Sequence, residues 1–121
     1  YREKELESRR MFEEAAALKL LCRKALFLIN DRVDIALATD ADGVHVGQAD
    51  LPLPVARRLL GKRKIIGVTV SSVEEAARAI ADGADYLGVS PIFATDTKPN
   101  AGRPQGTELI RKIRKKQLKQ Q

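Results

Sequence analysis

The sequence has little aromatic character and almost no cysteine. It contains no tryptophan, and phenylalanine and tyrosine together make up only 4% of its 121 residues, so the core must be aliphatic. Cys22 is the only cysteine, which excludes an intrachain disulfide and is typical of a reducing cytosol. No apolar stretch approaches the roughly 20 residues that span a bilayer, and nothing at the start resembles a signal peptide. These absences predict a cytoplasmic globular protein with no membrane partner.

The charge is unbalanced toward the basic side. Twenty-two lysines and arginines against 16 acidic residues give a net charge of +6, which favours anionic partners. Several cations lie in the run 111–116 and in a basic, glutamine-rich tail at 115–121. No aromatic residues accompany this run for base stacking, so we interpret it as the solvated face of a final helix and expect no nucleic-acid partner.

Short apolar runs alternate with helix-like segments along the whole chain. The expected strands are 26–29, 43–47, 64–70 and 86–90. The expected helices are 8–24, 34–41, one that opens with residues 51–54 and stops at 61, one that follows residues 71–72 and runs to 81, and one from residue 107 or 108 onward. Ser8 is an expected N-cap, Gly61 an expected helix stop, and Ser71 with Glu74 an expected capping box. The unalternating run 26–29 predicts a strand buried on both faces.

This alternation predicts a parallel α/β fold. Residues 1–4 add the end of one earlier strand, so we expect about five βα units in a single domain, 1–121, with no linker. A closed eight-unit barrel usually needs at least about 200 residues. The chain is too short to close one alone, and its start without methionine suggests a piece of a longer protein.

Polar and charged residues follow each expected strand. They are Arg2 and Lys4, Asn30 and Asp31, Gln48 and Asp50, Thr69 and Ser71, and Thr95, Thr97 and Lys98. The carboxyl ends of parallel strands meet at one edge, where such folds carry their chemistry. Asp31 and Asp50 could hold Mg²⁺ together with phosphate oxygens, and Arg2, Lys4 and Lys98 could neutralise a pyrophosphate. The alternative is that these charges are ordinary solvated residues at the rim.

Three segments resemble the thiamine-phosphate synthase family. They are FLINDRVD at 27–34, ADGVHVGQAD at 41–50 and GADYLGVSPIFATDTK at 83–98; the opening YREK also looks like the end of the family's Gln-x-Arg-x-Lys strand without its glutamine. The resemblance covers nearly the whole chain to about residue 114. The family is a (β/α)8 TIM-type barrel, so the chain looks like a partial barrel from the exit of the second strand through the sixth helix.

The resemblance implies a transferase of thiamine biosynthesis. Its reaction joins hydroxymethylpyrimidine diphosphate to thiazole phosphate and releases pyrophosphate. By similarity, Asp31 and Asp50 hold Mg²⁺, and Arg2, Lys4 and Lys98 bind pyrophosphate oxygens. Asn30 and Thr69 would orient the pyrimidine substrate, with Thr69 replacing the more frequent serine, and Thr95 and Thr97 would contact the thiazole phosphate. We interpret His45 as structural or supporting, and Tyr86 and Phe93 as packing residues.

Some features depart from the family pattern. The junction at 24–25 is short, and Ser90 and Ala94 replace the usual glycine and proline. The first, seventh and eighth barrel strands fall outside the resemblance, so exposed sheet edges would favour association between copies of the chain. Two alternatives stay open: a related thiazole tautomerase, which would not need paired magnesium aspartates, and a non-catalytic remnant of the barrel.

Overall fold

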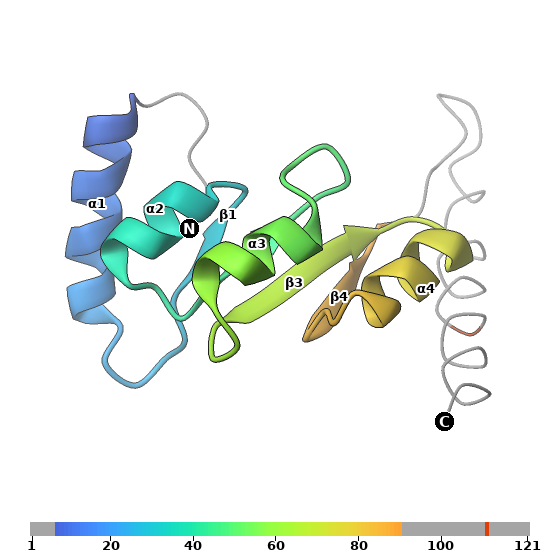
Figure 1. Cartoon of the computed structure of the whole chain (residues 1–121). Coiled ribbons are helices and arrows are strands. Elements are labelled where there is room, and N and C mark those ends of the chain that lie inside the picture. Colours follow the sequence, from blue (N-terminus) through green and yellow to red (C-terminus); the bar gives the residue numbers. More distant parts are fainter. Residues whose placement is uncertain (1–6, 91–110, 112–121) are drawn as a thin grey trace, which may run out of the picture.

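The computed structural model describes residues 7–90 and residue 111. Four strands form one sheet in the order β1-β2-β3-β4, and every pair is parallel. The strands are β1 (Leu28–Asn30), β2 (Gly43–Val46), β3 (Ile65–Val70) and β4 (Tyr86–Val89). Each strand therefore lies beside the next one in the chain, as in a barrel wall, and the predicted parallel α/β class is confirmed (Figure 1). The strand end expected at residues 1–4 lies outside the described residues. Of the helix expected from residue 107 or 108 onward, only residue 111 is described, and it is helical.

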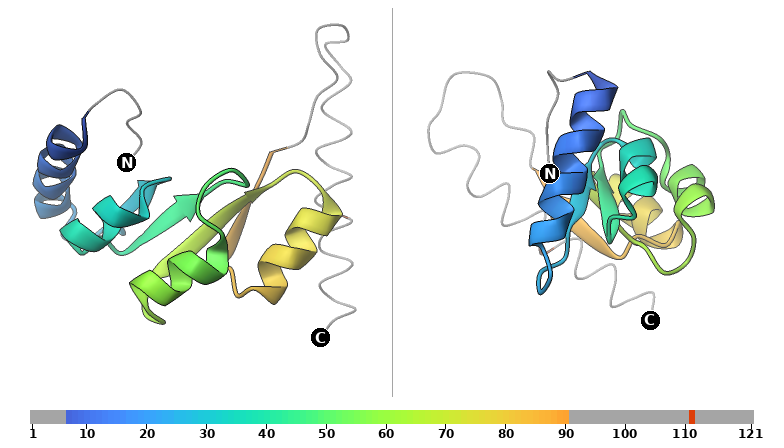
Figure 2. Two further views of the ribbon diagram at one scale, coloured as in Figure 1. Left: turned by 45° about the horizontal axis from the view of Figure 1, so that its top comes forward. Right: turned by 90° about the vertical axis from the view of Figure 1, so that its left-hand side faces the viewer.

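Three helices connect successive strands, and a fourth precedes the sheet. They are α1 (Ser8–Leu21), α2 (Val33–Thr39), α3 (Leu53–Leu60) and α4 (Val73–Ala81). Figure 2 shows α2, α3 and α4 on one face of the sheet, with α1 beside α2 at the β1 end. We call the face opposite α2–α4 the open face. Within the described part of the chain, no helix is long and apolar enough to cross a membrane.

The core lies between these helices and the sheet, and it is aliphatic as predicted. Its largest fully buried side chains come from three strands: Ile29, Val44, Val46, Ile66 and Val70. On α1, Met11 and Ala15 are buried, and Cys22 just beyond the helix is half-buried and packs against the same cluster. Cys22 is therefore a free cysteine that acts as a small packing residue.

The first strand differs from its prediction. It begins at Leu28, two residues later than expected, and Leu26 is 67% exposed. Only Phe27 and Ile29 are buried, while Leu28 is half-buried on the open face, so the prediction of a strand buried on both faces is wrong. The reason is that α2–α4 cover one face, so side chains alternate between core and open face. Helix α1 likewise ends at Leu21 instead of Lys24.

Of the three predicted helix ends, the stop at Gly61 is confirmed, and the N-caps of α4 and α1 lie at other residues than predicted. Gly61 ends α3 at a φ of +90°, a conformation that favours glycine. At α4 the cap is Ser72, whose Oγ accepts from the Glu75 N–H at 3.1 Å. The Glu75 carboxylate in turn accepts from the Ser71 N–H at 2.8 Å. The predicted Ser71–Glu74 box is thus one residue too early, because Ser71 is still part of the link from β3. Ser8 is also not a cap: it lies inside α1, where Glu7 is the N-cap.

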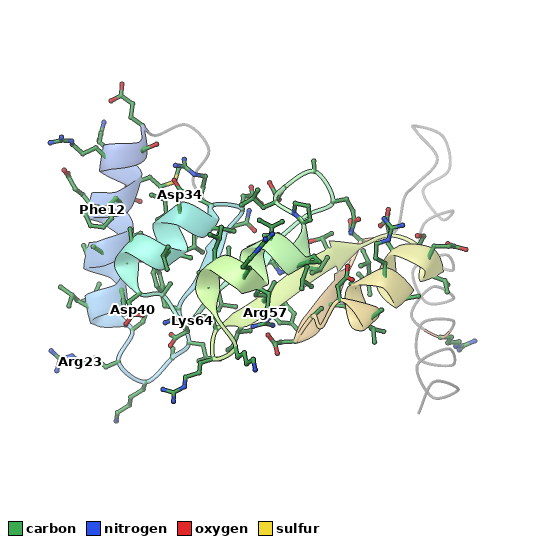
Figure 3. All side chains as sticks on the ribbon, viewed as in Figure 1. Phe12, Arg23, Asp34, Asp40, Arg57 and Lys64 are labelled. Carbon is green, nitrogen blue, oxygen red and sulfur yellow. The ribbon has the colours of Figure 1, made fainter. Side chains whose placement is uncertain are left out.

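Two aspartates secure the edge of the sheet where the strands begin. Asp42 Oδ2 accepts from the Phe27 N–H at 2.7 Å, and Asp85 Oδ2 accepts from the Ile66 N–H at 2.8 Å. Asp85 also pairs with the Arg57 guanidinium at 2.8 Å. Lys64, Asp40 and Arg57 lie along this same edge (Figure 3). The hydrogen bond from Arg57 is the main reason that the pKa of Asp85 lies below its usual value.

We expect Asp85→Asn to lower the free energy of unfolding by about 1 kcal/mol at pH 7, because charge-assisted hydrogen bonds become neutral ones. A lowered carboxyl pKa contributes stability above the unfolded pKa of about 4, and this contribution is lost as the pH falls through the folded value. The difference between the original chain and the variant should therefore shrink as the pH drops from 7 to 3. Urea denaturation at both pH values measures it.

Asp82→Asn is the matched control for this prediction. Asp82 is exposed in the turn after α4, three residues before Asp85, and the same substitution there should change stability little at either pH. Equal effects of the two substitutions at pH 7 would contradict the role assigned to Asp85.

Candidate active site at the carboxyl ends of the strands

Within the described part of the chain, four of the predicted site residues lie at the carboxyl ends of three neighbouring strands. Asn30 is the last residue of β1 and Asp31 follows it. Asp50 lies in the loop after β2, and Thr69 is near the end of β3. All four are half-buried. Arg2, Lys4, Thr95, Thr97 and Lys98 lie outside the described residues.

Asp31 has an unusual backbone conformation. Its φ is +71°, in the left-handed region that residues other than glycine rarely adopt. The Arg32 N–H donates to the carbonyl of Asn30 at 2.8 Å, so Asp31 is the central residue of a γ-turn. The Asp31 N–H donates to the His45 carbonyl at 2.8 Å and ties the turn to β2. Strained backbone of this kind occurs disproportionately at functional sites, where it aims a side chain.

Asp50 belongs to a tight turn at the end of β2. Its Oδ2 accepts from the Gly47 N–H at 2.7 Å, and its own N–H donates to the Gly47 carbonyl at 3.2 Å. In the same loop, Gln48 Nε2 donates to the Thr69 carbonyl at 2.8 Å and links the turn to β3. These bonds hold the Asp50 carboxylate close to the ends of both strands.

His45 lies at the centre of the group, on the open face of β2. Its Nε2 is 2.6 Å from Thr69 Oγ1, and its Nδ1 is 2.8 Å from the Tyr86 hydroxyl. Burial lowers the pKa of His45, while the carboxylates of Asp31 and Asp50 act in the opposite direction. Both carboxylates therefore lie within electrostatic reach of one imidazole, although they come from different loops.

The donor set is compatible with a hard cation shared with a substrate. No group of three or more histidine, cysteine, aspartate or glutamate side chains within residues 7–90 could hold a metal on its own. Two carboxylates with nearby hydroxyl and amide groups are instead the arrangement that Mg²⁺ uses when phosphate oxygens and water complete its shell. Asp31 and Asp50 thus fit Mg²⁺ bound together with a phosphorylated ligand.

A small cavity adjoins the candidate site from the other side of the sheet. It lies on the helix side of the sheet, lined by Val46 and Val68 together with Glu75 and Arg78 of α4. Gly47, Gln48 and Asp50 of the loop after β2 also line it, but His45 and Thr69 on the open face do not. The polar cluster on the open face is therefore the better candidate for catalysis.

The sequence interpretation missed the part played by Tyr86. The sequence predicts a packing residue, yet the Tyr86 hydroxyl is hydrogen-bonded to His45 and the two rings are 5.4 Å apart at their centroids. The available signal was the alternation of β2, where His45 stands between Val44 and Val46, both of which are buried. A polar residue in that position must point to the opposite face, toward whatever the neighbouring strands present there.

Comparison with known proteins agrees with the resemblance in the sequence. The family model for thiamine monophosphate synthase matches residues 1–119. A thiamine-phosphate synthase of Chloroflexus aurantiacus is 56% identical over 116 residues, which cover 94% of this chain and 53% of that protein. One of Moorella thermoacetica is 56% identical over 115 residues, covering 93% and 55%.

A solved structure agrees as well. The thiamine phosphate pyrophosphorylase from Pyrococcus furiosus superposes with a TM-score of 0.76 at 44% identity, over 92% of this chain and 53% of that one. The chain spans about half the length of the relatives that it matches. From the family model and these identities, the chain belongs to the thiamine monophosphate synthase family.

Proposed function

We propose that the protein is a thiamine-phosphate synthase, which joins hydroxymethylpyrimidine diphosphate to thiazole phosphate and releases pyrophosphate. The observation that carries this proposal is the convergence of Asp31, Asp50 and Thr69 on His45, at the strand ends of a family member. The paired carboxylates favour this transferase over a thiazole tautomerase, which would not need two aspartates for a metal-bound pyrophosphate.

The residues have distinct roles in this proposal. Asp31 and Asp50 would hold Mg²⁺, which when bound stabilises the negative charge of pyrophosphate. Arg2, Lys4 and Lys98 would bind the pyrophosphate oxygens, and Thr95 and Thr97 the thiazole phosphate. Asn30 and Thr69 would orient the pyrimidine diphosphate.

The chemistry needs no protein nucleophile. The carbon–oxygen bond to the leaving pyrophosphate breaks, and the pyrimidine ring stabilises the resulting cation. The thiazole nitrogen then forms the new carbon–nitrogen bond. The task of the protein is to orient both substrates and to stabilise the charge that develops on the leaving group.

The first test replaces the matching segment of the Chloroflexus aurantiacus enzyme with residues 1–114 of this chain. Because the identity is 56%, we expect the chimera to fold and to release pyrophosphate from both substrates together in a magnesium-dependent manner. The 121-residue chain is assayed in parallel, since activity there would mean that copies associate to complete the site. A folded chimera without activity would contradict the proposal and favour the tautomerase or the inactive remnant.

The second test introduces Asp31→Asn and Asp50→Asn, each alone, into whichever of the two proteins is active, the chimera or the 121-residue chain. Asparagine tolerates the positive φ at residue 31 and keeps the size of both side chains, so folding should persist. Turnover at saturating Mg²⁺ should fall by about 100-fold or more for each variant, in the range seen when charge-stabilising groups are removed. The concentration of Mg²⁺ for half-maximal activity should rise.

Asp40→Asn is the matched control for these variants. Asp40 also has a positive φ, +53°, but it pairs with Lys64 at the opposite edge of the sheet. Its replacement should leave turnover and magnesium dependence unchanged. Equal losses at Asp40 and Asp31 would mean that the substitution disturbs the backbone and that no metal role is supported.

A further inference from the structure

Three residues of the open face form one row across the sheet. The strand register pairs His45 with Gly67, and Gly67 in turn with Tyr86. His45 and Tyr86 are therefore two strands apart, with only a glycine between them. Their side chains close this gap through a 2.8 Å hydrogen bond between the Tyr86 hydroxyl and His45 Nδ1.

Glycines make the space for this contact. A Cβ at Gly67 would overlap the Tyr86 ring, which lies across that position. A Cβ at Gly88 would come within 3.2 Å of His45 Cε1. Side chains at these two positions would separate the rings. The contact between His45 and Tyr86 therefore depends on glycine at both positions.

The network has a direction that follows from donor and acceptor chemistry. A neutral imidazole donates from one nitrogen and accepts at the other. Its two partners here are the phenolic hydroxyl of Tyr86 and the aliphatic hydroxyl of Thr69. The phenol is the more acidic hydroxyl and the stronger donor, so it donates to Nδ1. The proton of the ring then lies on Nε2 and is donated to Thr69 Oγ1.

Thr69 is the end of this chain of hydrogen bonds. Because its oxygen accepts from His45, its own proton is available to a third group on the site side of the sheet. The Asp31 N–H is bonded to the His45 carbonyl, and the loop that carries Asp50 is bonded through Gln48 to the Thr69 carbonyl, so an anion held by a metal at these two carboxylates would lie near the Thr69 hydroxyl.

We propose that Tyr86 and His45 are positioning residues that hold the Thr69 hydroxyl as a hydrogen-bond donor toward a phosphate oxygen of the diphosphate substrate. This inference rests on the proposed function for the identity of the substrate. The direction of the hydrogen bonds within the protein can be measured without it.

The direct test uses the histidine itself. His45 is the only histidine in the sequence, so long-range ¹H–¹⁵N NMR of the labelled 121-residue chain at pH 8 reports a single imidazole. We expect one dominant tautomer, with the proton on Nε2 and none on Nδ1. A dominant Nδ1–H tautomer would overturn the proposal, because Thr69 would then donate to the ring and not to a ligand.

Two variants test the part of Tyr86 in different ways. Tyr86→Phe removes the hydroxyl but keeps the ring, whereas Gly67→Ala keeps the hydroxyl but displaces the ring. Both should convert the single tautomer into a mixture, because Nδ1 loses its donor. Thr69→Ser keeps the acceptor at Nε2 and is the control that should retain the original tautomer. An unchanged tautomer in both Tyr86→Phe and Gly67→Ala would contradict the proposed direction.

Kinetics separate positioning from simple packing in the active protein or chimera. We expect Tyr86→Phe to lower kcat by about 5- to 10-fold, and Thr69→Val to lower it by more. Tyr86→Phe should have little further effect in the Thr69→Val background, since it acts through the hydroxyl that is already missing. Multiplicative effects in the double variant would contradict the proposal. If the unaltered protein releases no pyrophosphate, the proposed function fails, while the NMR result still decides the direction of the hydrogen bonds.

Discussion

The register of the parallel strands is the constraint on which both the core and the candidate site depend. Side chains along a strand point alternately to its two faces, and the register aligns these faces across all four strands. Ile29, Val44 and Ile66 are thereby buried beneath the helices. On the open face, Asn30 is paired in register with His45, and His45 is hydrogen-bonded to Thr69. A slip by one residue in any strand would exchange these two sets. Stability and function are therefore fixed by the same backbone pairing.

The two ends of the strands use their carboxylates differently. Where the strands begin, Asp42 and Asp85 accept hydrogen bonds from backbone N–H groups, and Arg57 lowers the pKa of Asp85. Both carboxylates thus have hydrogen-bond donors within the protein itself. Where the strands end, Asp31 lies in a strained γ-turn, and Asp50 is drawn back onto Gly47. At the first edge Asp40 adopts the αL conformation that is common at a helix C-cap, whereas the γ-turn at Asp31 lies at the second edge, which agrees with stability at one end of a barrel wall and chemistry at the other.

Local sequence signals predicted most elements but not their details. Apolar runs located β2, β3 and β4, and Gly61 gave the end of α3, because these signals depend on neighbouring residues alone. Leu26 was misassigned because burial depends on which face the helices cover. For the site, the rule that parallel strands carry functional residues at their carboxyl ends predicted that Asn30, Asp31, Asp50 and Thr69 share one edge of the sheet. Their metal and substrate roles stay predictions. Tyr86 was missed because its contact with His45 crosses a whole strand, and a pattern along the chain does not show the register that brings them together.

The chemical character of the open face indicates what it is built to contact. If the open face were only a core surface that another part of the protein covers, aliphatic side chains would dominate it. Leu28 and Ile65 do occupy the row nearest the strand starts, where they are half-buried. Toward the strand ends the same face carries an amide, an imidazole and two hydroxyls, separated by Gly67 and Gly88. Polar groups that already hydrogen-bond in a directed chain are suited to an ordered polar ligand, because they need no rearrangement when it binds. The exposed leucines lie elsewhere: Leu20, Leu21 and Leu26 are near the end of α1, and Leu37, Leu51 and Leu59 are in or just before the helices that cover the other face. The open face thus has the composition of a binding surface at one end and of a core at the other, as the lining of a barrel with its site at the carboxyl ends requires.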